Sequence, residues 1–223
     1  MNLEKKDKEI FQAIEKLRSE IIAEAKAFDF IDYGAGDPDA NLDHESMYRG
    51  VKKTRSTAEM CKIGLKNNWA EFLYLLVKEH KPKQILELGT CCGFSSIYMA
   101  KANPEATIYT IEGCEDLAKI AQSNMQKLQC SNIISIVGRF QDVLKENLEQ
   151  IKEIDLAFID GHHDHDATLH YYKQIKPYLS THAIVIFDDI NWSDGMKKAW
   201  NTISTDPDFQ KVEDLGKLAV CYM

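Results

Sequence analysis

The stretch Ile85-Leu-Glu-Leu-Gly-Thr-Cys-Cys-Gly-Phe-Ser-Ser96 decides the fold class of this 223-residue chain. An apolar run ends before Gly89, and a helical segment follows Gly93, so the stretch predicts a strand, a tight turn and a helix start. Glycines allow close backbone approach, and the free N–H groups of a helix N-terminus can bind an anion. The stretch is therefore interpreted as a loop of the nucleotide-binding type.

Outward from this loop, short apolar runs alternate with helical stretches. The runs lie at 85–88, 108–111, 133–137, 154–159 and 183–187, and the helical stretches lie at about 94–102, 115–128, 142–150 and 166–178. Such alternation predicts a parallel sheet with helices on both faces. Residues 211–215 and 218–222 flank Gly216-Lys217 and predict an antiparallel hairpin. We expect an α/β, Rossmann-like, doubly wound and mostly parallel seven-stranded sheet that ends in this hairpin.

The N-terminal part differs, and residues 1–65 are predicted to be a helical extension with a loop, ahead of a domain over 66–223. Apolar residues recur at helical spacing over 3–28, and their face could pack on another subunit to form a homo-oligomer. The Gly/Asp/Pro/Asn-rich stretch 32–41 predicts a loop. The short basic cluster at 49–55 is interpreted as a solvated loop, and a second helix is predicted over 59–79.

Composition excludes several classes of partner. The net charge is −8 and no long basic stripe occurs, which argues against nucleic acid. No apolar run approaches the roughly 20 residues that a membrane span needs. The charged N-terminus lacks an apolar signal core, and the six cysteines show no zinc-site spacing, so we expect a cytoplasmic protein with free thiols.

Ligands of parallel α/β sheets bind beyond the carboxyl ends of the strands, so the residues there carry the functional information. Glu112 ends the second strand, and a carboxylate at that place can accept hydrogen bonds from both ribose hydroxyls. The glycine spacing of the first loop is GxxxG rather than GxGxxG, which disfavours NAD. Taken together, Glu87, Gly89, Gly93 and Glu112 indicate a cofactor site rather than an ordinary tight turn.

At this point the residues match a known family. ILELGTCCGFSS resembles motif I of class I S-adenosylmethionine-dependent methyltransferases, in the ELGxxxGxS form of the catechol O-methyltransferase-like group. The segment Val137-Gly-Arg-Phe-Gln-Asp142 is similar to the part of that group that contacts adenine. The resemblance covers about residues 69–223 and implies S-adenosylmethionine as cofactor. The predicted cofactor residues are Glu87, Gly89, Thr90, Gly93, Ser95, Glu112, Phe140, Gln141 and Asp160.

Acidic residues follow two neighbouring predicted strands. Asp160 follows the fourth strand, within the run Asp-Gly-His-His-Asp-His-Asp, and Asp188-Asp189 follow the fifth. Three carboxylates at adjacent strand ends repel one another unless they are protonated, spread apart or neutralised by a cation. Oxygen ligands suit a hard ion such as Mg²⁺. The sequence therefore predicts a metal site formed by Asp160, Asp188 and Asp189.

The resemblance adds roles to these residues. Metal-dependent catechol-type O-methyltransferases have an Asp after strand four and an Asp-Asn pair after strand five; here the pair is Asp-Asp. Their catalytic Lys is replaced by His163, which looks more like the bacterial macrolide-sugar O-methyltransferases. The resemblance implies Asp160 and His163 as catalytic residues, with neutral His163 as the base that takes the acceptor's proton.

The sequence thus predicts a methyltransferase that acts on a hydroxyl of a small-molecule acceptor, with Mg²⁺ assistance. Trp192 follows the second acidic pair and is the aromatic residue expected at the mouth of the site. Three alternatives stay open. They are a metal-independent methyltransferase acting on nitrogen or another oxygen, an NAD(P)-binding oxidoreductase, and a non-enzymatic protein that retains the cofactor pocket.

Overall fold

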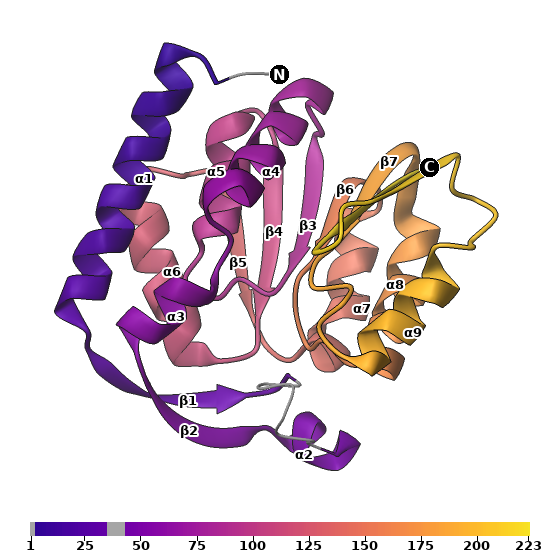
Figure 1. Ribbon diagram of the computed structural model, residues 1–223, viewed down its shortest axis with the longest axis horizontal. Helices are drawn as coiled ribbons and strands as arrows, with labels where there is room; N and C mark the ends of the chain where they lie inside the picture. The colour runs from indigo at the N-terminus through magenta and orange to yellow at the C-terminus, as the bar shows by residue number, and fades with distance from the viewer. Residues whose placement is uncertain (1–2, 35–42) are drawn as a thin grey trace.

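The computed structural model describes residues 3–34 and 43–223, and its centre is the predicted seven-stranded sheet (Figure 1). The strand order is β5-β4-β3-β6-β7-β9-β8. The five strands from β5 to β7 are parallel, whereas β9 is antiparallel to both β7 and β8. This confirms the α/β, Rossmann-like class and the C-terminal hairpin. The strands are β3 (Gln84–Leu88), β4 (Thr107–Glu112), β5 (Ile133–Val137), β6 (Ile154–Ile159), β7 (Leu179–Phe187), β8 (Lys211–Asp214) and β9 (Ala219–Tyr222).

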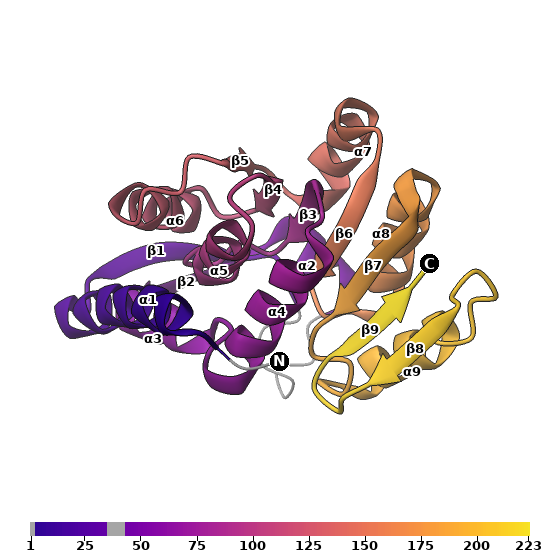
Figure 2. The same cartoon turned by 90° about the horizontal axis from the view of Figure 1, so that it is seen from above.

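Helices cover both faces of this sheet, as the view from above shows (Figure 2). Side chains alternate between the faces along each strand, so that Leu86 and Leu88 pack towards α7, α8 and α9 while Ile85 packs towards α4 and α5. The strands are buried on both sides, which explains why they read as short continuous apolar runs. The helices are α4 (Asn67–His80), α5 (Phe94–Ala102), α6 (Glu115–Lys127), α7 (Phe140–Ile151), α8 (His165–Ile175, followed by a 3-10 turn at Lys176–Tyr178) and α9 (Asp194–Ile203).

The N-terminal part departs from the prediction. The helix predicted over 3–28 is α1 (Lys5–Glu24), which ends where Ala25 adopts a left-handed conformation with φ of 47°. The chain then forms β1 (Ala27–Asp32), so the loop predicted from residue 32 begins later. Residues 35–42 of that loop lie outside the described residues.

The basic cluster at 49–55 is not a loop either. Its first residue ends the short helix α2 (His44–Arg49), and β2 (Val51–Ser56) follows, antiparallel to β1. The helix predicted over 59–79 is two helices, α3 (Thr57–Ile63) and α4, separated at Gly64. The polar sequence of β2 hid the strand, because only one face of this two-stranded hairpin packs on the domain.

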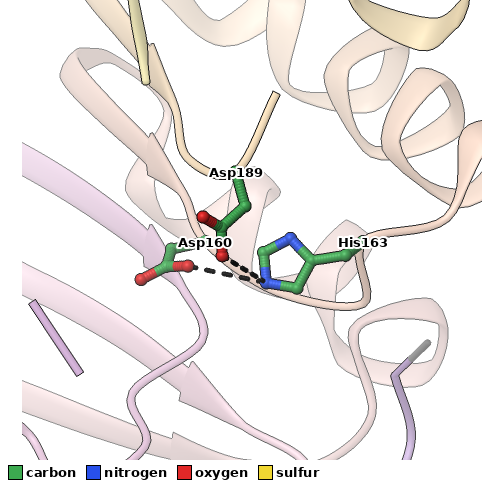
Figure 3. Close-up of side chains that lie close together, drawn as sticks. All are labelled: Asp160, His163 and Asp189. Atoms are coloured by element: carbon green, nitrogen blue, oxygen red, sulfur yellow. Dashed lines mark ion pairs between the residues drawn. The ribbon is translucent and has the colours of Figure 1, made fainter. Parts of the chain in front are cut away.

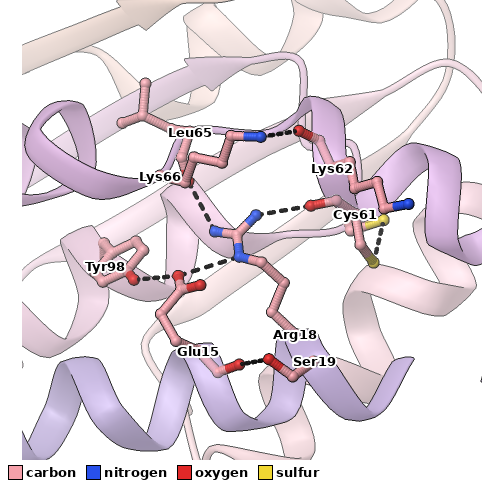
Figure 4. Close-up of polar contacts among 9 residues, drawn as sticks. Glu15, Arg18, Ser19, Cys61, Lys62, Leu65, Lys66 and Tyr98 are labelled. Atoms are coloured by element: carbon pink, nitrogen blue, oxygen red, sulfur yellow. Dashed lines mark hydrogen bonds and ion pairs between the residues drawn. The ribbon is translucent and has the colours of Figure 1, made fainter. Parts of the chain in front are cut away.

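Helix α1 is fixed to the domain by one buried cation (Figure 4). The Arg18 side chain is only 3% exposed, and its guanidinium donates to the carbonyls of Cys61 at 2.9 Å and Leu65 at 2.7 Å. It also donates to Glu15 at 3.1 Å and lies 3.9 Å from the centre of the Phe94 ring. The guanidinium therefore provides hydrogen-bond donors for carbonyls at and just after the end of α3, and it links α1 to α5 through the Phe94 ring.

The apolar side of α1 has its partner within the same chain. Ile14, Leu17 and Ile21 are buried in one cluster with Phe94 and Ile97 of α5. This face is therefore not free for a second subunit, and a homo-oligomer needs another surface. The division of the chain at residue 65 stays a prediction. No helix in the described ranges is both long and apolar enough to cross a membrane.

Candidate functional site

A cavity of about 710 Å³ lies at the carboxyl ends of the parallel strands. Its walls come from the loops after β3, β4, β6 and β7, and from the β1–β2 hairpin that crosses this end of the sheet (Figure 1). This is where ligands bind in doubly wound sheets, and the volume suits a molecule of cofactor size. The cavity brings together these predicted site residues: Gly89, Glu112, Phe140, Gln141, Asp160, His163, Asp188 and Asp189.

The predicted cofactor loop is held against the end of β4. Gly89 adopts φ of 103°, and a Cβ there would lie 1.9 Å from the carbonyl oxygen of Asp160, so only glycine fits between the two loops. The carboxylate of Glu112 accepts the N–H of Cys91 on one oxygen and the N–H of Cys114 on the other, both at 2.9 Å. Glu112 therefore shapes the loop and also presents its carboxylate to the cavity.

Glu112 has an altered acidity. Burial raises the pKa of its carboxyl to about 7, and the backbone N–H donors counteract only part of that shift. A hydroxyl pair that donates to this carboxylate would favour its ionised form. Tyr33 packs over the neighbouring Gly113, where a Cβ would lie 2.8 Å from the Tyr33 ring. Tyr33, which follows β1, thus packs against the residue next to Glu112.

Four predicted cofactor residues do not line the cavity. Glu87 is fully buried and accepts the hydroxyls of Ser96 and of Thr110, the latter at 2.6 Å, while burial raises the pKa of its carboxyl. The Thr90 hydroxyl also lies 2.6 Å from the Thr110 hydroxyl. These groups support the loop from beneath. A direct cofactor contact by Glu87, Thr90, Gly93 and Ser95 stays a prediction.

Phe140 and Gln141 begin α7 on the other side of the cavity. The Phe140 ring meets Tyr171 edge-on at 5.4 Å. The Tyr171 hydroxyl donates to the side-chain oxygen of Gln141 at 3.2 Å, which fixes the orientation of the amide. The amide nitrogen of Gln141 is buried and has no partner among the described residues. A buried donor of this kind calls for a ligand acceptor.

Asp160, His163 and Asp189 converge on one point of the cavity (Figure 3). The Nε2 atom of His163 lies 3.7 Å from Asp160 Oδ1 and 3.9 Å from Asp189 Oδ2. One ligand atom from each residue lies within 4.8 Å of the others, a spacing that fits a single metal ion. Asp188 is the predicted ligand that falls outside this group. The structure therefore offers a mixed oxygen and nitrogen set rather than three carboxylates.

Electrostatics in this cluster are unfavourable without a ligand. Burial raises the pKa of Asp160 well above its usual value, and the charge of Asp188 raises it further. Burial also raises the pKa of Asp188. Burial lowers the pKa of His163, so the ring is neutral near pH 7 despite the surrounding carboxylates. Neutral His163 can accept a proton or bind a metal ion.

The backbone is strained at the same place. His162, His163 and Asp189 adopt φ angles of 70°, 46° and 52°, in the left-handed region that side chains other than glycine rarely enter. Cys91, in the loop after β3, has φ of 49°. Strain of this kind persists only where the surrounding structure imposes it, and it gathers at functional sites.

Lys217 is a site residue that the sequence analysis missed. Its ammonium donates to Asp188 Oδ1 at 2.5 Å and lies 2.9 Å from Asp189 Oδ1. The hairpin itself was predicted, but only the observed pairing of β9 with β7 brings its turn beside the end of β7. Trp192 lies at the mouth as expected, 38% exposed, with its ring 6.1 Å from that of His163.

Phe30 and Arg55 were missed for a different reason. Both line the cavity from the β1–β2 hairpin. Phe30 lies between the helix predicted over 3–28 and the loop predicted over 32–41, and Arg55 lies in the cluster interpreted as a solvated loop.

Comparison with known proteins agrees with this geometry. Residues 86–190 match the family described as methyltransferase domain. A catechol O-methyltransferase of Niastella koreensis is 35% identical over 113 residues, covering 48% of this chain and 51% of that protein. A catechol O-methyltransferase of Mycobacterium tuberculosis is 27% identical over 60% of each chain. The chain thus spans about half the length of the curated relatives that it matches.

Solved structures show the same fold. An O-methyltransferase from Bacillus cereus in complex with SAH superposes with a TM-score of 0.64 at 20% identity, covering 74% of this chain and 86% of that one. The O-methyltransferase of tomaymycin synthesis from Streptomyces achromogenes, in complex with SAM, gives 0.61 at 20% identity, covering 72% and 82%. The chain therefore resembles methyltransferase domains in sequence over residues 86–190 and shares its fold with O-methyltransferases of known structure.

Proposed function

We propose that this protein transfers a methyl group from S-adenosylmethionine to a hydroxyl of a small molecule, with assistance from a divalent metal ion such as Mg²⁺. One observation carries the proposal. A single cavity is lined both by Glu112 and Gln141 and by the group Asp160, His163 and Asp189.

The cofactor end fits an adenosine. Each carboxylate oxygen of Glu112 accepts a backbone N–H and, with its further lone-pair capacity, can also accept a ribose hydroxyl. The unpartnered amide nitrogen of Gln141 can donate to a ring nitrogen of adenine, with Phe140 beside it. S-adenosylmethionine would supply an activated methyl group on a sulfonium.

The acceptor end fits proton removal from a hydroxyl. His163 is neutral near pH 7, and its Nε2 atom faces the point where Asp160 and Asp189 converge. It can therefore take the proton of a hydroxyl placed there. A divalent ion held by Asp160 and Asp189 would lower the pKa of that hydroxyl and orient it. His163 cannot bind the ion through Nε2 and act as base through the same atom, so metal binding would rest on the carboxylates.

The direct test is a screen of hydroxylated small molecules with methyl-labelled S-adenosylmethionine, with and without Mg²⁺. We expect label transfer that falls when EDTA is added. Transfer that is unaffected by EDTA would refute the metal part of the proposal and leave the methyl transfer in place. Absence of S-adenosylhomocysteine binding by the wild-type chain would refute the proposal as a whole.

Metal-independent methyl transfer is the second candidate, and Lys217 is the observation that favours it. Its ammonium already neutralises part of the charge of Asp188 and Asp189. The EDTA arm of the same screen separates the two candidates.

A further inference from the structure

Lys217 is the only lysine or arginine among the described residues that forms an ion pair with the acidic cluster. It contacts Asp188 and Asp189 but not Asp160. Its side chain is 37% exposed, whereas that of Asp188 is 3% exposed. The ammonium therefore lies between the carboxylates of Asp188 and Asp189 and the solvent, on the side of the β8–β9 turn.

The sheet fixes this lysine in place. Phe187, the last residue of β7, pairs with Ala219 at the start of β9, so the β8–β9 turn lies beside the residues that follow β7. The backbone N–H of Ile190 donates to the carbonyl of Lys217 at 3.0 Å. Asn191 donates its side-chain N–H to the carbonyl of Gly216 at 2.5 Å. The position of Lys217 thus follows from strand register rather than from a freely moving surface side chain.

Asp189 connects two halves of the cluster. Its Oδ1 atom lies 2.9 Å from the Lys217 ammonium, and its Oδ2 atom lies 3.9 Å from His163 Nε2. Asp188 Oδ1 is occupied as well, because it accepts both the Lys217 ammonium and the backbone N–H of Asp189 at 2.8 Å. The geometry leaves Asp189 Oδ2 and Asp160 for a ligand.

The charges of the cluster follow from these contacts. When all three carboxylates are ionised, as binding of a metal ion would favour, they leave two negative charges beside the Lys217 ammonium and neutral His163, and a divalent ion can balance these. Without Lys217 a third negative charge would remain, and a nearly inaccessible carboxylate would lose its partner. The Lys217 ammonium is strongly attracted to the two carboxylates in this partly buried site. A metal ion bound beside it would be repelled by the ammonium and would share the same carboxylates, so the ammonium opposes metal binding.

We infer that Lys217 is the resident counter-cation of Asp188 and Asp189, a positioning residue that directs Asp189 towards His163 and limits the affinity of this site for divalent ions. The inference rests on the proposed function, since it concerns the metal assigned to that site. Lys217 compensates one negative charge of the Asp188–Asp189 pair, so the effects of removing Lys217 and of removing the charge of Asp189 should offset each other.

The test is a double-variant cycle on the full chain, with Mn²⁺ and Mg²⁺ binding measured by calorimetry in the presence of S-adenosylhomocysteine. We expect Lys217→Met to bind Mn²⁺ about tenfold more tightly than the wild type, because one opposing charge is removed. Asp189→Asn should bind it about tenfold more weakly. The double variant has the wild-type site charge and should return to within about threefold of the wild-type affinity.

Matched controls separate charge from folding. Lys217→Arg keeps the charge and should keep the wild-type affinity. Lys211→Met alters the same hairpin at a lysine that pairs with Glu213 and should have no effect on Mn²⁺ affinity. If Lys217→Met does not fold, the double variant is compared with Asp189→Asn, and tighter Mn²⁺ binding by the double variant supports the inference.

Unchanged or weaker Mn²⁺ binding on loss of Lys217, in either comparison, overturns the inference, and so does the absence of binding in every variant. The first outcome concerns Lys217 alone, whereas the absence of binding in every variant also removes the metal ion from the proposed function. The proposed function fails separately, if the wild-type chain does not bind S-adenosylhomocysteine in the same calorimeter.

Discussion

Two clusters of buried charge in this protein are built in opposite ways. The Arg18 guanidinium donates to two backbone carbonyls and to the Glu15 carboxylate (Figure 4), and it also lies over the ring of Phe94. The aspartate cluster gathers three carboxylates around one ammonium and one neutral imidazole. Figure 3 shows Asp160, Asp189 and His163 of this cluster.

The difference separates a charge that stabilises the fold from charges that await a ligand. Buried charge without full compensation destabilises a protein, so it persists where binding or catalysis uses it. The backbone agrees, since left-handed conformations occur at His163 and Asp189, whereas Arg18 lies in a regular helix. The comparison predicts that substitutions in the two clusters change different properties.

The largest effect is expected on turnover at His163. His163→Ala should lower the methyl-transfer rate by about 10²- to 10⁴-fold, because the acceptor hydroxyl loses its base. Steady-state assays with labelled cofactor measure it, and binding of S-adenosylhomocysteine should stay the same. His165→Ala is the control, since that ring pairs with Asp166 at 2.6 Å outside the cavity. A wild-type rate for His163→Ala would exclude this residue as the base.

Next in size is the stability lost at Arg18. Arg18→Met should lower the free energy of unfolding by about 3–5 kcal/mol, because two buried carbonyls lose their donor and the Glu15 carboxylate keeps the Tyr98 hydroxyl but loses the guanidinium. Urea unfolding measures it, with Lys16→Met, an exposed change on the same helix, as control. A loss for Arg18→Met no larger than that for Lys16→Met would show that α1 is held by other contacts.

A change of opposite sign is expected at Asp160. Asp160→Asn should raise the free energy of unfolding of the metal-free protein at pH 8 by about 1 kcal/mol, because it removes a desolvated charge that is repelled by Asp188. The same variant should lose methyl transfer. If Asp160→Asn lowers the free energy of unfolding instead, the Asp160 charge is compensated by its surroundings as fully as that of Arg18. The proposed difference between the two clusters would then be wrong.

A pH dependence of stability is expected at Glu112. Its folded-state pKa of about 7 exceeds the ordinary value of 4.5, so the folded state binds more protons than the unfolded state between these values. Stability of the ligand-free protein should therefore fall as pH rises from about 4.5 to 7. Glu112→Gln should flatten this part of the profile in urea unfolding across pH. An unchanged slope would assign the titration to another group.

The sequence was informative where strands are buried on both faces. The apolar run at Ile133–Val137 and its counterparts located the parallel strands, and adjacency of β6 and β7 brought Asp160 near Asp188, as the residues had indicated. Trp192 was placed at the mouth for the same reason.

Other features depend on contacts between segments far apart in sequence. In the sequence, Lys217 is an ordinary residue of a predicted hairpin turn. Only the pairing of β9 with β7 brings it to Asp188 and Asp189. Glu87 lies in the stretch predicted to bind the cofactor. Its carboxylate faces away from the cavity, however, because it accepts the hydroxyls of Ser96 and Thr110. The strand Ala27–Asp32 was hidden because Phe28 continued the helical spacing of α1.

The central claim is that the cavity between Glu112 and Gln141 holds an S-adenosylmethionine-type cofactor. Isothermal titration calorimetry of the wild-type chain with S-adenosylhomocysteine, and separately with NADH, tests it most directly. The account predicts binding of S-adenosylhomocysteine that Glu112→Ala weakens by about 10- to 100-fold, because hydrogen bonds to a charged group are lost, and no binding of NADH. Binding of NADH without S-adenosylhomocysteine would contradict it.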